Sequence, residues 1–262
     1  MLRPNRLAPY PRVLEHDVFI ADLDPRHDGV RIAHLSDVHV GRMTPEGHVR
    51  HAVELANRAG ADVIALTGDY VNWSRREIPL MEAQLSGLSA TRVMVTLGNH
   101  DYFTSARRIA EAMRRNGYDV LRNQHSRVMI NGAPLYVVGI DDPVTRHHDV
   151  DASFAGVPEG GTRIVLCHCP EQADTIIERG AHLVLSGHTH GGQIYVEGIT
   201  DRVIRRMGRR YRAGFYKLED GWLYVSAGVG FSGIRVRVGN GTRAEVGVFT
   251  LRRGLPDEMI AA

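Results

Sequence analysis

Residues 30–41 read VRIAHLSDVHVG, and this stretch contains the pattern that decides the fold: a short apolar run that ends abruptly in polar residues. Each such run is rich in Val, Ile and Leu and lacks helical periodicity, so it predicts a buried strand. The polar residues then follow the carboxyl end of a strand, where α/β sheets bind their ligands. The pattern recurs as DVIALTGD at 62–69, RVMVTLGNHD at 92–101, RIVLCH at 163–168 and HLVLSGHTH at 182–190.

The segments between these runs predict helices, and the alternation is typical of a largely parallel α/β sheet. Thr44 is the expected N-cap of the first helix and Gly60 its expected stop. After residue 190 the pattern changes to apolar runs between glycine-rich turns, which predict an antiparallel second sheet packed on the first. The expected helices are 45–59, 77–88, 104–116 and 170–179, and the expected later strands are 192–196, 213–218, 222–226, 234–238 and 244–251.

The composition is that of a folded globular protein. The 262 residues are 43% hydrophobic and 24% charged, which excludes a disordered or collagen-like chain. The formal net charge of +2 is too balanced to predict nucleic-acid binding. We find no run of about 18–20 apolar residues that would span a membrane, and no signal peptide at the start. These features predict a cytoplasmic protein, with a membrane-peripheral location or a removed targeting segment as the alternatives.

The polar clusters supply a set of candidate metal ligands. Imidazole together with carboxylate suits divalent Mn, Fe or Zn. Seven ligands are too many for one such ion, but they suffice for two ions if one carboxylate bridges them. Two metals about 3.5–4 Å apart are a common device for in-line displacement at phosphorus. The seven candidates are Asp37, His39, Asp69, Asn99, His168, His188 and His190.

Taken together and in order, the clusters D-x-H, G-D, G-N-H-D, a lone H and G-H-x-H resemble the signature of the calcineurin-like metallophosphoesterase superfamily. The resemblance implies a four-layer α/β/β/α sandwich of two mixed sheets flanked by helices. It implies one domain over residues 1–262, with the motif core at 30–190. Residues 191–193 and 224–228 further resemble a bacterial branch of phosphodiesterases related to UDP-2,3-diacylglucosamine hydrolases.

The resemblance also implies a role for each motif residue. Two divalent ions are expected, Mn first, with Fe or Zn as alternatives, and a hydroxide between them is the expected nucleophile. His100 is expected to stabilise the transition state or protonate the leaving oxygen, and Asp101 to orient His100. The implied ligands are Asp37, His39 and His190 for the first metal, Asn99, His168 and His188 for the second, and Asp69 as the bridge.

Asn72, Tyr102 and Phe103 follow motif residues and could line the pocket, with ordinary loop packing as the alternative. Arg205 and Arg206 are further candidate substrate contacts. The segment 202–212 holds six arginines, Arg202, Arg205, Arg206, Arg209, Arg210 and Arg212. It offers contact with a phosphorylated substrate or an anionic membrane, and the alternative is a solvated charged face. Cys167 and Cys169 flank His168 but face away from it on an extended segment, so we expect no zinc site of soft ligands there.

The preferred interpretation is a metal-dependent phosphodiesterase acting on a small-molecule or lipid-linked substrate. One alternative is a pyrophosphatase acting on a UDP-linked lipid or sugar precursor. A phosphomonoesterase and a non-catalytic metal-binding scaffold are the others. Each motif taken alone is also compatible with an ordinary surface loop, and only the five together point to this chemistry. The sequence leaves the oligomeric state open.

Overall fold

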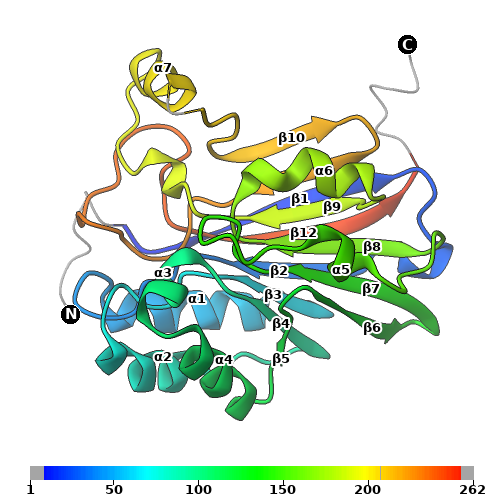
Figure 1. Ribbon diagram of the computed structural model, residues 1–262, viewed down its shortest axis with the longest axis horizontal. Helices are drawn as coiled ribbons and strands as arrows, with labels where there is room; N and C mark the ends of the chain where they lie inside the picture. The colour runs from blue at the N-terminus through cyan, green and yellow to red at the C-terminus, as the bar shows by residue number, and fades with distance from the viewer. Residues whose placement is uncertain (1–8, 207, 255–262) are drawn as a thin grey trace.

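The computed structural model describes residues 9–206 and 208–254, and the predicted domain of residues 1–262 extends beyond them at both ends. Two six-stranded sheets face each other (Figure 1). The first has the order β1 (Arg12–Ile20), β12 (Glu245–Arg253), β2 (Arg31–Leu35), β3 (Val63–Thr67), β4 (Arg92–Thr96), β5 (Asp119–Val120). The second has the order β10 (Gly214–Leu218), β11 (Gly221–Val225), β9 (Leu183–Ser186), β8 (Thr162–Cys167), β7 (Ala133–Ile140), β6 (Gln124–Ile130).

Helices cover the outer face of each sheet, which confirms the predicted four-layer α/β/β/α sandwich (Figure 1). The first sheet is covered by α1 (Glu46–Arg58), α2 (Ile78–Leu85) and α4 (Ala106–Arg115). The second is covered by α5 (Val150–Phe154) and α6 (Ala173–Glu178). The remaining helices are α3 (Asn99–Thr104), α7 (Ile199–Arg206) and the 3-10 turns η1 (Pro25–His27), η2 (Arg75–Glu77), η3 (Pro170–Gln172) and η4 (His190–Gly192).

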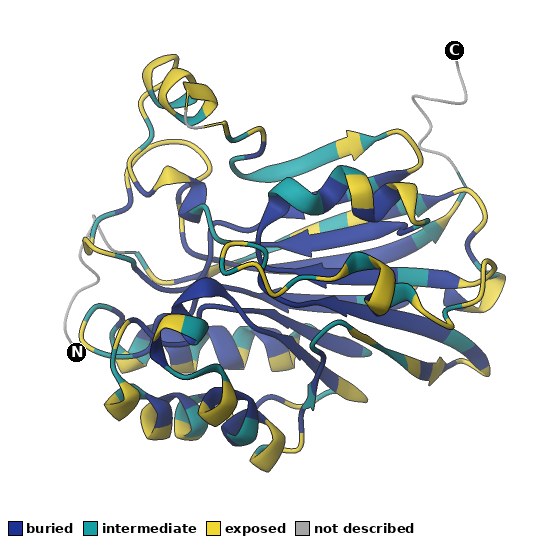
Figure 2. Cartoon of the chain, in the orientation of Figure 1, coloured by how far each residue is buried: buried dark blue, intermediate teal, exposed yellow. Residues whose placement is uncertain are grey.

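The alternation of side chains along each strand separates three apolar cores. On β3, Val63 and Ala65 belong to the core between the sheets, whereas Ile64 and Leu66 face α1 and α2. Both faces of the strand are therefore buried, which is why the run reads as continuously apolar in the sequence. Figure 2 shows the resulting buried centre and the exposed outer faces of the helices.

The five motif strands form as predicted. Their division between two sheets was not predicted. The first three are β2, β3 and β4 of one sheet, and the last two are β8 and β9 of the other. The C-terminal strands do not make a separate antiparallel sheet. β10 and β11 extend the second sheet, and β12 inserts between β1 and β2 of the first.

Several predicted boundaries were wrong. Residues 192–196 and 234–238 are not strands and meet only in a single bridge between Ile194 and Val238. The helix predicted at 104–116 forms as α4 and begins after Ser105, which ends α3. Thr44 does not cap α1, because its hydroxyl accepts from the Phe231 N–H at 3.1 Å. β1, β5, β6 and β7 had no counterpart among the predicted strands.

Within residues 9–206 and 208–254, no helix has both the length and the apolar content to cross a bilayer.

Phe249 on β12 tests the core between the sheets. Its ring is fully buried and lies 4.9 Å from the ring of Tyr224 on the opposing sheet. We expect Phe249→Ala to lower the free energy of unfolding by about 3–5 kcal/mol, because it leaves a cavity where the sheets meet. Urea unfolding measures this, with Met129→Ala, an exposed site on β6, as the control. A loss below about 1 kcal/mol for Phe249→Ala would contradict this packing.

Candidate metal centre

The candidate ligands meet because the two sheets present the carboxyl ends of their parallel strands at one edge. Backbone hydrogen bonds continue past the strand ends and join the loops. The Asp37 N–H donates to the Gly68 carbonyl at 3.0 Å, and the Gly187 N–H donates to the His168 carbonyl at 3.0 Å. The loops are therefore held together by the same pairing that builds the sheets.

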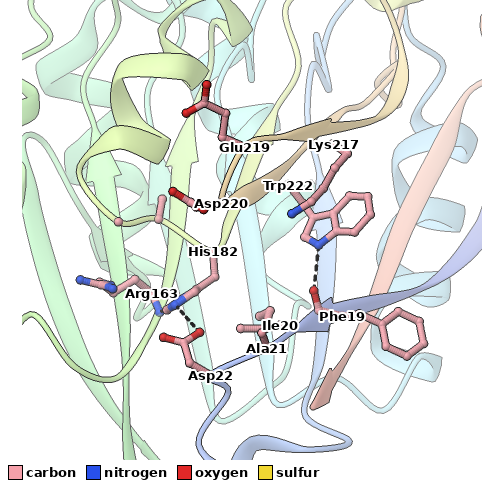
Figure 3. A pocket seen from close by; sticks show the side chains of 12 residues that line it. Phe19, Ile20, Ala21, Asp22, Arg163, His182, Lys217, Glu219, Asp220 and Trp222 are labelled. Atoms are coloured by element: carbon pink, nitrogen blue, oxygen red, sulfur yellow. Dashed lines mark hydrogen bonds and ion pairs between the residues drawn. The ribbon is translucent and has the colours of Figure 1, made fainter. Parts of the chain in front are cut away.

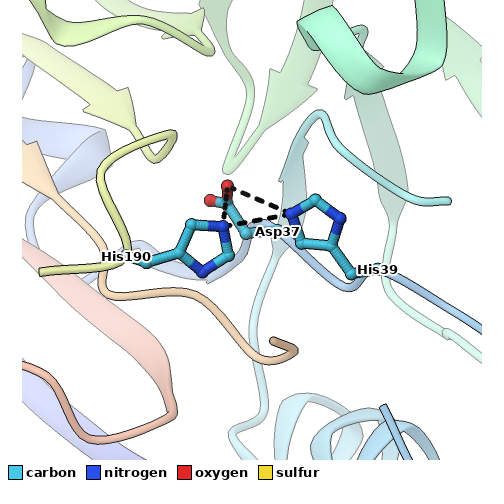
Figure 4. A group of neighbouring side chains, drawn as sticks. All are labelled: Asp37, His39 and His190. Carbon is cyan, nitrogen blue, oxygen red and sulfur yellow. Dashed lines mark hydrogen bonds and ion pairs between the residues drawn. The ribbon is translucent and has the colours of Figure 1, made fainter. Parts of the chain in front are cut away.

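Asp37, His39 and His190 form the first ligand group (Figure 4). The Nε2 atoms of His39 and His190 are 3.0 Å apart, and Asp37 Oδ1 lies 3.3 Å from His190 Nε2. Two ring nitrogens that face each other repel unless a proton or a cation lies between them. One carboxylate and two imidazoles in this arrangement fit a divalent cation such as Mn, Fe or Zn.

Asp69, His168 and His188 form the second group, and Asp69 connects it to the first. Asp69 Oδ2 lies 3.3 Å from His168 Nε2 and 3.7 Å from His39 Nε2. Asn99 Oδ1 is buried and has no hydrogen-bond partner, as expected of an oxygen reserved for a cation. Six of the predicted ligands therefore come together in overlapping groups that are linked through His39 and Asp69.

A backbone carbonyl fixes the ring of His168. His168 Nδ1 donates to the Thr67 carbonyl at 2.6 Å, which turns Nε2 toward Asp69. A hydrogen bond of this kind fixes the ring orientation of a metal-binding histidine. Asp37 is fixed as well, because both of its oxygens accept from the His188 N–H, at 3.2 and 3.0 Å.

Burial keeps most imidazoles of the site neutral. It lowers the pKa of His39 to about 4 and the pKa of His188 to about 3, so protons do not compete for these nitrogens near neutral pH. Burial also opposes the charge on Asp69, but His168, His39 and His100 outweigh it and hold the pKa of Asp69 well below its usual range. Burial likewise works against His168, yet Asp69 raises the pKa of His168 to about 10. A proton on His168 thus balances the Asp69 carboxylate, which is the balance a cation would provide.

The ligand loops are strained. Five of the candidate ligands adopt positive φ angles between 46° and 69°: Asp37, His39, Asp69, His188 and His190. Such backbone costs about 1–3 kcal/mol per residue and clusters at functional sites. The glycines of the motifs permit the close approach of the loops. A Cβ at Gly98 would collide with Asp69, and one at Gly187 would collide with Ser36 and Asp37.

His100 faces the centre from the start of α3. Its Nε2 lies 4.0 Å from Asp69 Oδ2, and its Nδ1 donates to the Asn72 carbonyl at 2.8 Å. Its backbone N–H donates to Asp69 Oδ1 at 2.8 Å. The ring is therefore oriented with Nε2 toward the ligands, where it can reach a group bound between them.

Asp101 was predicted to orient His100, but its carboxylate bonds to other groups. Its carboxylate accepts the backbone N–H groups of Gly98 and Asp69 at 2.9 Å and of Tyr70 at 3.0 Å. The partner of His100 Nδ1 is instead the backbone carbonyl of Asn72. A partner on the backbone cannot be recognised from a motif of side chains. Asp101 is a positioning residue that ties two motif loops together.

The predicted substrate contacts lie in three different settings. Asn72 is buried, and its Nδ2 donates to the His39 carbonyl at 3.1 Å, so it positions the site instead of facing a substrate. Tyr102 is half-buried, with its hydroxyl bonded to Asp141 and Arg122. Arg205 and Arg206 are exposed on α7.

Two residues of the site were not predicted. Trp73 is 65% exposed, and its ring centroid lies 4.3 Å from that of His100. Arg237 is buried and donates to the carbonyls of Ala227, Gly228, Gly230 and Thr242, which holds the loop beneath Asp37. Arg237 lies in the run that was predicted to be a strand at 234–238. That prediction gave no sign that its side chain is buried.

A separate pocket opens at the opposite end of the second sheet (Figure 3). Arg163 and His182 lie at the amino ends of β8 and β9, whereas His168 and His188 follow the carboxyl ends. This pocket therefore does not belong to the metal centre. Its main side chains are Phe19, Asp22, Arg163, His182, Lys217 and Trp222.

The fold and the paired ligand groups define a metallophosphoesterase. Residues 30–192 match the calcineurin-like phosphoesterase family, and the chain belongs to that family. This confirms the predicted superfamily.

Named relatives share this class. The chain is 31% identical over 229 residues to the uncharacterized metallophosphoesterase YkoQ of Bacillus subtilis, covering 82% of each chain. It is 27% identical to a transmembrane protein with metallophosphoesterase domain of Danio rerio, covering 93% of this chain and 58% of that protein. The chain therefore spans less than two thirds of the Danio rerio relative. A solved structure, GAP50, the anchor in the inner membrane complex of Plasmodium, aligns with 76% of this chain and 71% of its own at 12% identity, with a TM-score of 0.47.

Asp69→Ala tests the sharing of one carboxylate between the two groups. We expect the variant to lose both metals, because each group loses a ligand and His168 loses its charge partner. Elemental analysis of the purified, Mn²⁺-loaded protein measures this. Asp174→Ala, a carboxylate on α6 outside the site, is the matched control. Retention of both metals by Asp69→Ala would contradict the shared ligand.

Proposed function

We propose that the chain is a phosphodiesterase that uses two divalent metal ions, with Mn as the first candidate. The observation that carries the proposal is the Asp69 carboxylate, which lies between two ligand groups with His100 beside it. When bound, two such ions polarise the phosphoryl oxygens and lower the pKa of water. Asp37, His39 and His190 would hold one ion, Asn99, His168 and His188 the other, and Asp69 both.

The surroundings of His100 favour a diester over a monoester. A monoester carries an additional charge, which a site usually balances with cationic side chains. Beside His100 lie Trp73 and Phe103, which are exposed aromatic residues. An apolar flank suits a second organic substituent on phosphorus.

His100 supplies the proton chemistry in this proposal. Because Nδ1–H is engaged by the Asn72 carbonyl, Nε2 is the atom available to the substrate. A protonated Nε2 donates to the leaving oxygen, or bonds to a phosphoryl oxygen as charge develops there. Asn72 and Asp101 keep this geometry by fixing the two loops.

The direct test is turnover of bis-p-nitrophenyl phosphate against p-nitrophenyl phosphate. We expect the diester to be preferred, turnover to stop on chelation, and Mn²⁺ to restore it. His100→Ala should keep its metal content and lose about 10²–10⁴-fold in kcat, the usual contribution of a general acid or base. Met129→Ala on exposed β6 should behave as the wild type. Turnover that survives chelation, or full turnover by His100→Ala, would refute the mechanism.

A second candidate is a pyrophosphatase acting on a UDP-linked lipid or sugar precursor. The specific observation is an exposed surface beside the metal centre, here named the lip, comprising residues 193–206 and 232–238. Its two segments are joined by hydrogen bonds between Tyr195 N and Val238 O and between Val238 N and Gln193 O, both at 2.8 Å. Release of UMP from UDP-2,3-diacylglucosamine would support this candidate.

The lip combines apolar and basic side chains. Six of its large apolar residues are between 43% and 65% exposed: Ile194, Val196, Ile199, Val203, Ile234 and Val238. Exposed arginines lie among them: Arg202, Arg205, Arg206 and Arg235. α7 stands away from the sheets at this end of the molecule, and most of it is exposed (Figures 1 and 2). An apolar surface with interspersed arginines is typical of contact with an anionic bilayer.

The lip adjoins the candidate metal ligands. The Gln193 N–H donates to the carbonyl of His190 at 3.0 Å. A bilayer against the lip would therefore bring lipid-linked substrates to the centre. We propose that the lip binds an anionic membrane surface.

Sedimentation with vesicles tests the lip. We expect the protein to bind vesicles containing phosphatidylglycerol more strongly than phosphatidylcholine vesicles, with binding that weakens as salt rises. Changing Arg202, Arg205 and Arg206 to Ala should abolish the preference, because each arginine contributes about 1 kcal/mol to the free energy of binding an anionic membrane. The control changes Arg107, Arg108 and Arg114 on α4 to Ala, the same loss of charge at another exposed surface. Equal binding to both vesicles would refute the contact.

A further inference from the structure

Two exposed aromatic side chains stand together at the metal centre. Trp73 precedes η2, Phe103 lies in α3, and they are 65% and 55% exposed. Their rings are stacked with 6° between the planes and 5.8 Å between the centroids. We name this pair the aromatic platform. Large apolar groups that remain exposed beside a polar site often mark a binding surface.

The aromatic platform lies one side chain away from the shared carboxylate. The Trp73 and Phe103 centroids are 4.3 and 6.0 Å from the His100 centroid. His100 Nε2 is in turn 4.0 Å from Asp69 Oδ2. A group attached to a phosphate at the metal centre would thus meet the platform while the phosphate stays in place.

The loop that carries Trp73 is fixed by a single carboxylate. Glu77 Oε2 accepts the backbone N–H groups of Asn72, Trp73 and Ser74, at 2.9, 3.2 and 3.2 Å. Arg75 Nε then donates to the Thr104 carbonyl at 3.3 Å, which ties this loop to the end of α3 next to Phe103. The backbone segments that carry the two rings are therefore held in place, which lowers the conformational cost of binding a ligand there.

We propose that the aromatic platform stacks a flat aromatic group, such as a nucleobase, that the substrate carries on its phosphate. The inference rests on the proposed function and names the substrate class of that site. Two parallel rings favour a third ring in the same orientation, because offset stacking is the preferred contact between aromatic faces. Stacking also tolerates different bases, since every base offers a flat face.

The chain provides its own probe for this contact. Trp73 and Trp222 are the two tryptophans of the sequence. Trp222 donates to the Phe19 carbonyl at the opposite end of the second sheet (Figure 3), so Trp222→Phe leaves Trp73 as the single reporter. The experiment titrates this Mn²⁺-loaded protein with adenosine 5′-monophosphate and with ribose 5-phosphate, which has the same phosphate and sugar but no base.

We expect adenosine 5′-monophosphate to quench Trp73 fluorescence and to bind about tenfold more tightly than ribose 5-phosphate, the usual gain from one stacked base. Calorimetry on the double variant Trp73→Ala, Phe103→Ala should bring the two affinities within about twofold, with ribose 5-phosphate bound as in the wild type. Met129→Ala should keep the preference. Equal affinities in the wild type, or a preference that survives in the double variant, would overturn the inference.

The outcomes separate this inference from the proposed function. Quenching by adenosine 5′-monophosphate without turnover of phosphodiesters would support the platform and refute the phosphodiesterase. Turnover of phosphodiesters without a preference for the base would refute the platform and leave the phosphodiesterase standing.

Discussion

The structure depends on one buried carboxylate. Asp69 Oδ2 lies within 4.0 Å of ring nitrogens from His39, His100 and His168, which come from three different strand ends. A buried carboxylate needs compensating positive charge, and here the compensation must come from protonated imidazole or from cations. Candidate ligands from both sheets lie against this one charge, and the His100 backbone N–H donates to Asp69 Oδ1 at 2.8 Å.

Holding that carboxylate requires loops that approach closely and adopt unfavourable backbone. The glycines at 98 and 187 allow the approach, and the strained ligand residues are held by hydrogen bonds that extend the strands. Asp101 contributes by accepting three backbone N–H groups, including that of Asp69. The two sheets supply the rigid frame that keeps these loops from relaxing.

The sequence predicted what is encoded locally. Each motif strand carries its own signal, because an apolar run followed by a polar cluster depends only on neighbouring residues, whereas the candidate ligands were recognised from the five clusters together. The assignment of strands to the two sheets was not predicted. β12 pairs with β2, which lies far away in the sequence, and a local pattern carries no information about such a pairing. The partner of His100 was missed because it is the backbone of Asn72, and Trp73 because its exposure depends on how Glu77 folds the loop.

The central claim is that Asp69 is shared by two metal ions. Anomalous diffraction from crystals grown with Mn²⁺ tests it most directly. The account predicts two peaks about 3.5–4 Å apart, one on each side of the Asp69 carboxylate. A single peak held by Asp37, His39 and His190, with none between Asp69 and His168, would contradict it.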